Sequence, residues 1–302
     1  MSGGTTSLHS TDNVIREVLA HDLGAWLKFD PVTRVGKDPE GVHQLRVNAR
    51  RMRAELKIFA PVITRRTRQQ LNTELRWIGQ ILGGQRDLDV LEQLLLDSQS
   101  PEHPLDEPVF KELRQRSARE QRRVQHALTS KRYSELLGEL TRFTVRPPFL
   151  SSARRPAREI LLPGLQDSLS VLFDQVNSSG PIPSDEALHL IRIKSKQGRY
   201  CAEVSAKFMG KPGESVALDL AKVQGVLGDL HDRTVALDYL RQHAGTVSVD
   251  DTRDGDTPLD LVVHELLRSS DDLRRAWRAP MTRARRRSTA LFLDAESAPV
   301  PT

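Results

Sequence analysis

The sequence predicts an all-α protein built from two related halves, and three observations support this prediction. Apolar residues recur every three to four positions through most of the 302 residues, which is the spacing of helices that bury one side. No stretch alternates apolar and polar residues over the length of a strand. A helical motif that begins at residue 43 returns at residue 189, a shift of 146 positions. We therefore expect two helical bundles related by a pseudo-twofold axis.

The first half is expected to span residues 10–147. Its first helix can be capped by Thr11 or Asp12. The pair Gly83-Gly84 is typical of a helix C-terminus, so a break is predicted there. The expected helices are 11–29, 41–59, 64–82, 85–97, 109–128 and 131–143, with turn-rich connections at 30–41 and 98–108.

The second half is expected to span residues 152–292, after a linker at 145–156. Ser184 or Asp185 can cap the helix that carries the repeated motif. A later helix is predicted to break near Gly228. The expected helices are 157–177, 186–208, 216–243, 259–278 and 281–292, and residues 1–9 and 293–302 are expected to be disordered tails.

Arginine dominates the positive charge of the chain. Lys and Arg number 45 against 40 Asp and Glu, the pI is about 9.5, and 35 of the 45 basic residues are Arg. An Arg guanidinium donates paired hydrogen bonds to phosphate or carboxylate oxygens, whereas Lys acts as a point charge. Codon bias in a GC-rich genome would also enrich Arg, but it would not place the residues at helical spacing. Aromatic residues, on which single-stranded nucleic acids usually stack, are only 5% of the chain, so a phosphate polymer is favoured over a base.

The sequence also predicts where the protein is found. Cys201 is the only cysteine, so no intrachain disulfide can form and a reducing compartment is expected. No apolar run approaches the ~20 residues that span a bilayer. The N-terminal residues lack the basic and then apolar pattern of a secretory signal. We expect a cytoplasmic protein with no membrane association.

The stretch at 41–59 is predicted to be a helix with two distinct faces. One face is an apolar stripe for packing, and beside it runs a basic row within an arc of roughly 80°, since about 100° separates successive residues. Like charges in a row repel one another, so we expect an anion to bind there. The stripe is Leu45, Ala49, Met52, Leu56 and Phe59, and the basic row is His43, Arg46, Arg50, Arg53 and Lys57.

The second half repeats the basic row in the same register. Each row is followed by a Leu-Gly element that ends in Asp, at residues 82–87 and 227–232, with His231 in the place of Arg86. One row could be a solvated face, but two rows in register are hard to ascribe to chance. Their equivalent faces could meet across a shared channel. The second row is His189, Arg192, Lys196 and Arg199.

The doubled motif, HxxR(V/I)xx(R/K)xxR followed by LGxx(R/H)D, resembles the CHAD family, whose name describes an α-helical domain with characteristic histidines. The resemblance covers residues 12–290 and implies two four-helix bundles that enclose a central basic pore. It also implies that the pore binds inorganic polyphosphate and that the protein associates with polyphosphate granules. The residues that match the family's motif are His43, Arg46, Arg50 and Arg53, then His189, Arg192, Lys196 and Arg199.

The sequence departs from the family pattern in three respects. Gln197 stands where the family often has a basic residue, and Gly198 where it usually has an apolar one. Many members carry a fused triphosphate-cleaving CYTH domain with an ExExK strand, and no ExExK occurs here, so that activity is not expected. The apolar stripe of the second helix has smaller side chains than the first, which indicates either close helix packing or a less stable second half. Its residues are Ile191, Ser195, Gly198, Ala202 and Ser205.

Several candidate residues have two interpretations. His43 and His189 either donate to phosphate or are hydrogen-bonded within the bundle. Arg86 and Asp87 either belong to the binding site or form a buried ion pair or helix cap. The remaining candidates are either part of the binding surface or a solvated face: Arg116, Arg119 and Arg123, and with less support Arg283, Arg285, Arg286 and Arg287.

Signals of enzymatic activity are weak. The chain has no P-loop, no HExxH and no Cys/His metal spacing. The Asp-rich stretch at 250–256 lacks the spacing of a Ca²⁺ loop. Asp87 and Asp232 could hold Mg²⁺ with phosphate, but one acid in each repeat is poor evidence for hydrolysis. We expect a non-enzymatic polyphosphate-binding protein without cofactor or metal. The alternatives are a nucleic-acid-binding helical protein, a metal-dependent phosphohydrolase acting on polyphosphate, and a helical scaffold.

Overall fold

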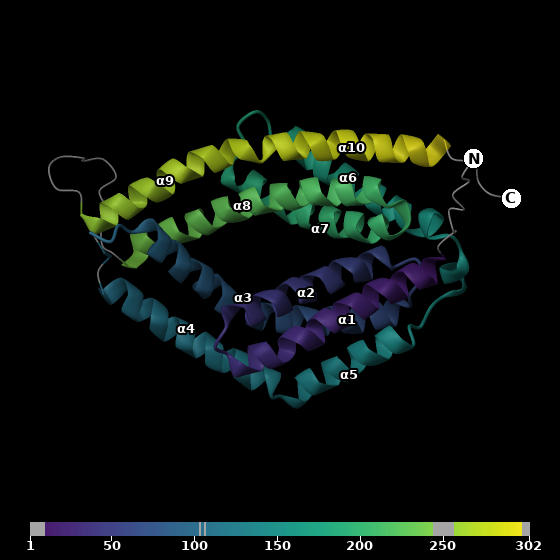
Figure 1. The fold of residues 1–302 in the computed structure, drawn as a ribbon, viewed down its shortest axis with the longest axis horizontal. Coiled ribbons are helices and arrows are strands. Elements are labelled where there is room, and N and C mark those ends of the chain that lie inside the picture. Colours follow the sequence, from purple (N-terminus) through teal and green to yellow (C-terminus); the bar gives the residue numbers. More distant parts are fainter. Residues whose placement is uncertain (1–9, 103, 106, 244–256, 298–302) are drawn as a thin grey trace.

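The computed structural model describes residues 10–102, 104–105, 107–243 and 257–297, and the predicted all-α fold class is confirmed there. In the view of Figure 1, α1, α2, α4 and α5 lie below α6–α10, and α3 rises at its left end to meet α8 and α9. The described ranges contain isolated bridges but no strand. The helices are α1 (Thr11–Val35), α2 (Pro39–Ile58), α3 (Arg65–Ser98), α4 (Glu107–Leu128), α5 (Lys131–Val145), the short 3-10 helix η1 (Ser151–Arg154), α6 (Ala157–Ser178), α7 (Asp185–Met209), α8 (Lys211–His243), α9 (Pro258–Ala276) and α10 (Arg278–Ser297).

The predicted tails and the Asp-rich stretch fall mostly outside the described residues. This is the case for residues 1–9, 250–256 and 298–302. The predicted start of the C-terminal tail at residue 293 is wrong, because α10 continues to Ser297. No helix among the described ranges is long and apolar enough to cross a membrane.

The predicted glycine breaks are wrong, because α3 and α8 each run through them as one helix. A glycine inside a helix costs about 1 kcal/mol relative to alanine, so these positions need another reason for glycine. A Cβ at Gly83 would lie 3.3 Å from the Arg46 Nε, and a Cβ at Gly84 would lie 2.6 Å from a carboxylate oxygen of Glu120. The glycines at 83 and 84 therefore make room for side chains of neighbouring helices.

The predicted end of the first helix at Phe29 is also wrong. α1 continues to Val35 and contains Pro31, so the connection to α2 is much shorter than the predicted 30–41. Pro31 is exposed, and the carbonyl that it leaves without an N–H partner can bond to water on that side of the helix. The helix ends instead at Gly36, whose φ of 70° is accessible to glycine without strain.

One hydrophobic core extends through both halves of the molecule. It contains every residue of the predicted α2 stripe, together with residues of α6, α7, α8 and α10. The smaller stripe of α7 is also buried, and a Cβ at Gly198 would lie 3.1 Å from the Leu169 side chain of α6 and 3.4 Å from that of Leu220 on α8. The small residues of α7 thus allow close packing on both neighbours, as one of the two interpretations predicted.

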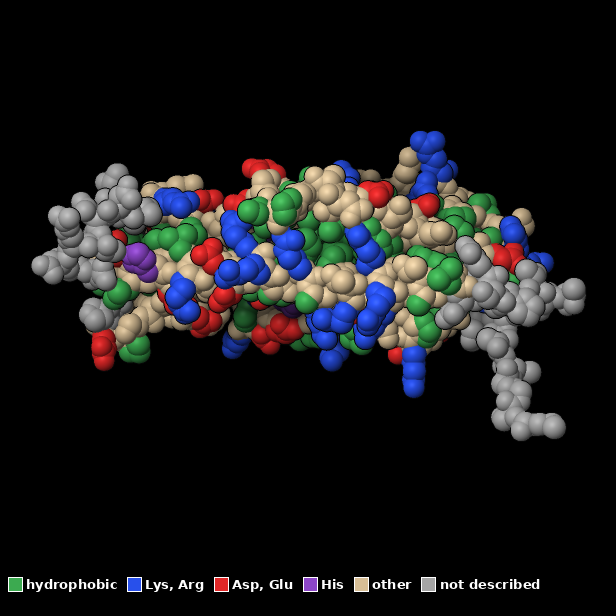
Figure 2. All heavy atoms as spheres, turned by 90° about the horizontal axis from the view of Figure 1, so that it is seen from above, with side chains coloured by type: hydrophobic (Ala, Val, Ile, Leu, Met, Phe, Trp, Pro, Cys, Tyr) green, Lys and Arg blue, Asp and Glu red, His purple; other side chains and the backbone are tan. Residues whose placement is uncertain are grey.

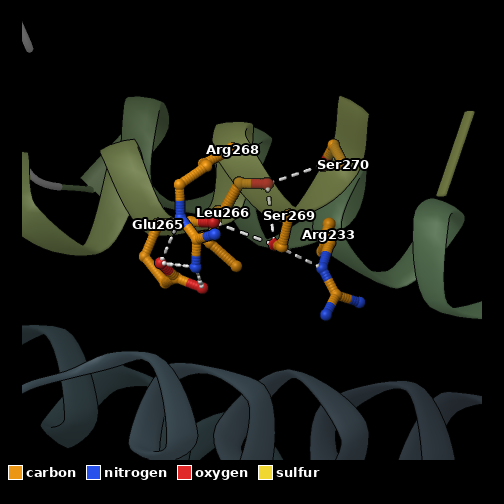
Figure 3. A network of polar contacts seen from close by, with 6 residues as sticks. All are labelled: Arg233, Glu265, Leu266, Arg268, Ser269 and Ser270. Atoms are coloured by element: carbon orange, nitrogen blue, oxygen red, sulfur yellow. Dashed lines mark hydrogen bonds and ion pairs between the residues drawn. The ribbon is translucent and has the colours of Figure 1, made fainter. Parts of the chain in front are cut away.

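A second hydrophobic cluster joins the far ends of the long helices. It combines residues of α3 and α4 from the first half with residues of α8 and α9 from the second. The Tyr239 hydroxyl of α8 donates to the Val109 carbonyl of α4 across it, at 3.0 Å. In Figure 3 the Arg233 Nε of α8 donates to the Ser269 hydroxyl of α9, at 2.8 Å. These contacts hold α8 against α4 and α9.

Candidate basic site between α2 and α7

Each basic row lies on a helix with a well-defined start. Asp38 caps α2 by accepting a hydrogen bond from the Glu40 backbone N–H at 2.8 Å, and Pro39 follows as the first helical residue. Ser184 caps α7 as predicted, accepting from the Ala187 N–H at 3.3 Å. The two capped helices pack against each other, and this contact brings the basic rows together.

Arginines of the two rows lie close enough to perturb one another. Burial lowers the pKa of Arg50 on α2, and the nearby charges of Arg46, Arg192 and Arg199 lower it further. The pKa of Arg192 on α7 is lowered by burial and by Arg46, although Asp232 opposes the shift. The cations of α2 and α7 therefore share one region of low solvent access.

Lys196 is the most perturbed cation of this region. Its burial, followed by the charges of Arg50, Arg192 and Arg46, lowers its pKa to about 6. An ammonium group with an ordinary pKa would be fully charged at neutral pH. The surroundings of Lys196 therefore favour its neutral amine over its ammonium form.

Three buried guanidinium nitrogens of the rows lack a hydrogen-bond acceptor. They are the Nε atoms of Arg50, Arg192 and Arg199. Arg199 still lies 3.5 Å from a Glu203 carboxylate oxygen, but Arg50, Arg192 and Lys196 form no ion pair within the described part of the chain. A buried charged donor without an acceptor is costly, so these groups are arranged for an acceptor that the chain does not supply.

A glycine of the neighbouring helix lies against one arginine in each row. A Cβ at Gly83 of α3 would lie 3.3 Å from the Arg46 Nε, and a Cβ at Gly228 of α8 would lie 4.0 Å from the Arg192 Nε. One helical turn after each glycine comes an aspartate. Asp87 pairs with Arg46 at 3.1 Å, and Asp232 stabilises the charge of Arg192. The Leu-Gly…Asp element thus places a glycine and an aspartate against an arginine of each row, and it does not end a helix.

The candidate histidines lie at the same end of the basic rows. Burial lowers the pKa of His43, and the charge of Arg86 lowers it further. On the other side the His189 and His231 rings lie 5.3 Å apart, and burial together with Arg192 lowers the pKa of His231 to about 4. Neither His43 nor His189 has a hydrogen-bond partner among the described residues. The interpretation in which they are hydrogen-bonded within the bundle therefore has no contact to support it.

Comparison with known proteins identifies the family of the chain. The sequence profile of the CHAD domain matches residues 17–241. The chain belongs to the CHAD domain family.

Known CHAD domains also share the fold of this chain. The CHAD domain of the plant Ricinus communis is 23% identical, with a TM-score of 0.66 over 91% of this chain and 92% of that one. PptA from Streptomyces chartreusis is 18% identical, with a TM-score of 0.64 over 93% of this chain and 100% of that one. The uncharacterized Mycobacterium tuberculosis proteins Rv2226 and MT2285 are each 28% identical over 214 residues, 68% of this chain. The chain spans only 40% of their length.

The last two residues of the predicted α2 row, Arg53 and Lys57, lie outside the region where the cations of α2 and α7 meet. The Arg53 Nε donates to the Asn72 side chain of α3 at 3.0 Å, and Arg53 faces Arg76 rather than α7. Lys57 is exposed and lies on the rim of a separate cavity, together with Lys194. The structure therefore brings together the first part of the α2 row, from His43 to Arg50, and the whole α7 row, from His189 to Arg199.

The predicted arginines of α4 do not act alike. Arg116 and Arg119 line a cavity of about 350 Å³ with Lys111, and the Arg116 guanidinium lies 5.9 Å from the centre of the Tyr239 ring of α8. Arg123 instead pairs with Glu120 of its own helix, at 3.4 Å. The Ser117 hydroxyl, next to Arg116 in the sequence, accepts a hydrogen bond from the Gln85 side chain of α3 at 3.0 Å, so α4 packs against α3 here.

The arginines of α10 mostly serve the packing of the second half. Arg283 and Arg287 both pair with Asp219 of α8, a carboxylate that is 1% exposed, at 3.2 and 2.7 Å. Arg285 donates to the Asn177 side chain of α6 at 2.9 Å. Figure 2, seen from above, shows basic side chains interspersed with acidic and apolar ones over the visible face rather than in one patch.

Sequence reasoning missed an acidic cluster beside the basic rows. Arg51 of α2 pairs with Glu203 of α7 at 3.1 Å and lies 3.9 Å from Asp22 of α1. Burial raises the pKa of Glu55 well above its ordinary value, and a hydrogen bond with Asp22 raises it further. The carboxylates come from three helices, and α7 lies far along the chain from α1 and α2, so no local sequence pattern predicted the cluster. No group of three or more His, Cys, Asp or Glu side chains in the described ranges is arranged to hold a metal ion.

Proposed function

We propose that this CHAD domain binds inorganic polyphosphate between α2 and α7. The observation that carries the proposal is the pair of buried, acceptor-free Nε atoms of Arg50 and Arg192, which face a shared region from two helices. Polyphosphate offers acceptor oxygens and negative charge at every unit and has no base that would need an aromatic platform. Its oxygens would accept the hydrogen bonds that the protein leaves unmade. Association with polyphosphate granules would follow from this affinity.

The binding mechanism that we propose is electrostatic. Arg46, Arg50, Arg192 and Lys196 would donate to successive phosphoryl oxygens along the polymer, and His43 and His189 would add donors at one end. Passage of the polymer through a closed central pore remains part of the proposal. Release of cations condensed on the polymer would favour binding, as for nucleic acids, so the affinity should fall steeply as the salt concentration rises.

The first test is reversal of Arg46, Arg50 and Arg192 to Glu in one variant. We expect loss of retention on immobilised long-chain polyphosphate while the helical circular dichroism signal is kept. The matched control reverses three exposed arginines, Arg66, Arg154 and Arg286, and changes the net charge equally. Equal retention of both variants would overturn the site, whereas loss confined to the first variant supports it.

Two rival functions are separated by further assays. Displacement of polyphosphate by duplex DNA or RNA at equal phosphate concentration would indicate a nucleic-acid-binding function. Release of inorganic phosphate from polyphosphate with Mg²⁺ or Mn²⁺ would instead indicate a phosphohydrolase. We expect neither result.

A further inference from the structure

A cavity of about 400 Å³ lies between the end of α2, α6 and α7. Much of its wall is apolar, from Ile58 and Pro61 near the end of α2 to Ile160, Pro163 and Val171 on α6. Ligand pockets for small molecules have volumes of about 300–1,000 Å³ and mostly apolar walls. The cavity therefore has the size and the lining of a small-molecule site.

The sequence of α6 keeps this cavity open. Pro163 lies inside the helix and is followed by Gly164, and both line the cavity. A Cβ at Gly164 would have no atom within 4 Å, so the empty space reaches the backbone of α6. Glycine inside a helix is unfavourable by about 1 kcal/mol relative to alanine, and here no packing contact accounts for it.

Two lysines at the rim give the cavity a positive charge. Lys57 of α2 and Lys194 of α7 form no ion pair with a carboxylate in the described part of the chain, although Asp167 also lines the cavity. The Ser168 side chain is 8% exposed and lines the same cavity, where its hydroxyl lies beside the Cys201 thiol. The charged groups of the lining are thus two lysines and one aspartate, which leave a net charge of +1, and the Ser168 hydroxyl lies within.

The cavity is separate from the basic site. Lys194 and Lys196 are two positions apart on α7, so at about 100° per residue they point to opposite sides of the helix. Lys196 faces α2 and Arg50, whereas Lys194 faces the cavity beside α6. A ligand of the cavity would not contact Arg50 or Arg192.

We propose that this cavity binds a small amphipathic anion, with its apolar body against α6 and its acidic head at Lys57 and Lys194. The apolar walls would stabilise the bound ligand by removing its apolar body from water. A phosphate chain has no apolar body and would gain nothing from these walls. The lysines supply the charge that an acidic head requires. The Ser168 hydroxyl would hydrogen-bond a polar atom of the ligand.

The test uses naphthalene-1-sulfonate as the probe and isothermal titration as the readout. Gly164→Leu fills the cavity from α6, and Gly138→Leu, at another helical glycine with no atom within 4 Å of an added Cβ, is the matched control. Lys194→Gln removes one rim charge. Naphthalene-1-sulfonamide tests the same body without the charge, and inorganic sulfate tests the charge without the body.

We expect the parent protein and Gly138→Leu to bind the sulfonate equally, Gly164→Leu to lose at least tenfold in affinity, and Lys194→Gln to lose several-fold. The sulfonamide should bind more weakly than the sulfonate, and sulfate should not displace it. Absence of binding by the parent, or equal binding by Gly164→Leu, would overturn the proposal, and so would displacement by sulfate. Polyphosphate retention by Gly164→Leu should be unchanged, which separates this site from the basic one.

Discussion

The Arg46 guanidinium of α2 lies 3.1 Å from the Asp87 carboxylate of α3, beside the acceptor-free arginines of the basic site. Asp87 is 64% exposed and Arg46 is 25% exposed, so the arginine is the more enclosed partner. An anion entering between α2 and α7 would compete with Asp87 for Arg46. The Asp87 carboxylate therefore occupies the place beside Arg46 that a phosphoryl group of the proposed ligand would take.

The first prediction is that Asp87→Asn strengthens polyphosphate binding. An exposed ion pair is worth about 0.2–1 kcal/mol, so its removal should raise affinity by up to about fivefold. Fluorescence titration at 100 mM salt measures the change. Asp271→Asn, an exposed aspartate of α9, is the control. Weaker binding by Asp87→Asn would mean that Asp87 positions Arg46 for the ligand rather than competing for it.

Replacing Arg50 or Arg192, whose buried Nε atoms have no acceptor, should change the polyphosphate affinity far more than Asp87→Asn does. A hydrogen bond to a charged group is worth about 1.5–3 kcal/mol, so Arg50→Gln or Arg192→Gln should weaken binding by about 10- to 100-fold. Each should also reduce the slope of log affinity against log salt by about 0.7–0.9 for one lost phosphate contact. Arg286→Gln on the exposed side of α10 should change neither quantity. An unchanged slope would place these arginines outside the phosphate contacts.

Binding should take up protons. The pKa of Lys196 is lowered to about 6, and a bound polyanion would raise it by favouring the ammonium form. Protons are therefore absorbed at pH 7.5, and affinity should fall as the pH rises from 6 to 8. Titration calorimetry in two buffers of different ionisation enthalpy measures the uptake. Lys196→Met should take up fewer protons than the parent, and an equal uptake by both would exclude Lys196 as the group.

Without ligand, Lys196 should destabilise the fold at neutral pH. Its pKa is lower in the folded state, so the unfolded chain binds more protons between about pH 6 and 10, and stability rises with pH across this window. Lys196→Met removes the penalty and should add more than about 1 kcal/mol at pH 7, since one pKa unit corresponds to ~1.4 kcal/mol. Urea unfolding at pH 7 and pH 10 should show this advantage shrinking. An advantage that is constant with pH would point to packing instead.

Two helical glycines should respond oppositely to valine. A Cβ at Gly198 would press on Leu169 at 3.1 Å, so Gly198→Val should destabilise the protein by about 1–3 kcal/mol through overpacking. Gly138 has no atom within 4 Å of an added Cβ, so Gly138→Val should gain a few tenths of a kcal/mol from helix propensity alone. Thermal unfolding compares the two. Similar effects at both positions would show that close approach to α6 does not explain Gly198.

The sequence predicted the helices and the basic rows because both depend on local spacing. The stripe from Leu45 to Phe59 is buried as its period requires, and the first part of the α2 row meets the α7 row. The prediction of helix breaks at Gly83 and Gly228 was wrong because glycine occurs both at helix ends and inside helices where a neighbouring side chain approaches closely. Only the position of Arg46 or Arg192 on the adjacent helix distinguishes close approach from a helix end.

Contacts between distant segments could not be predicted in the same way. Arg53 and Lys57 continue the row in sequence, yet Arg53 bonds to Asn72 of α3, and Lys57 lies at the cavity beside α6. Asp22 and Glu203 gather around Arg51 from helices that are separated by most of the chain. A single sequence carries no pattern for such a cluster.

A crystal structure with bound polyphosphate tests the central claim most directly. The account predicts phosphoryl oxygens within hydrogen-bonding distance of the Arg50 and Arg192 Nε atoms, with Arg46 and Lys196 on neighbouring units of the polymer. Polyphosphate bound along the arginines of α10 or α4, with both Nε atoms still without an acceptor, would contradict it.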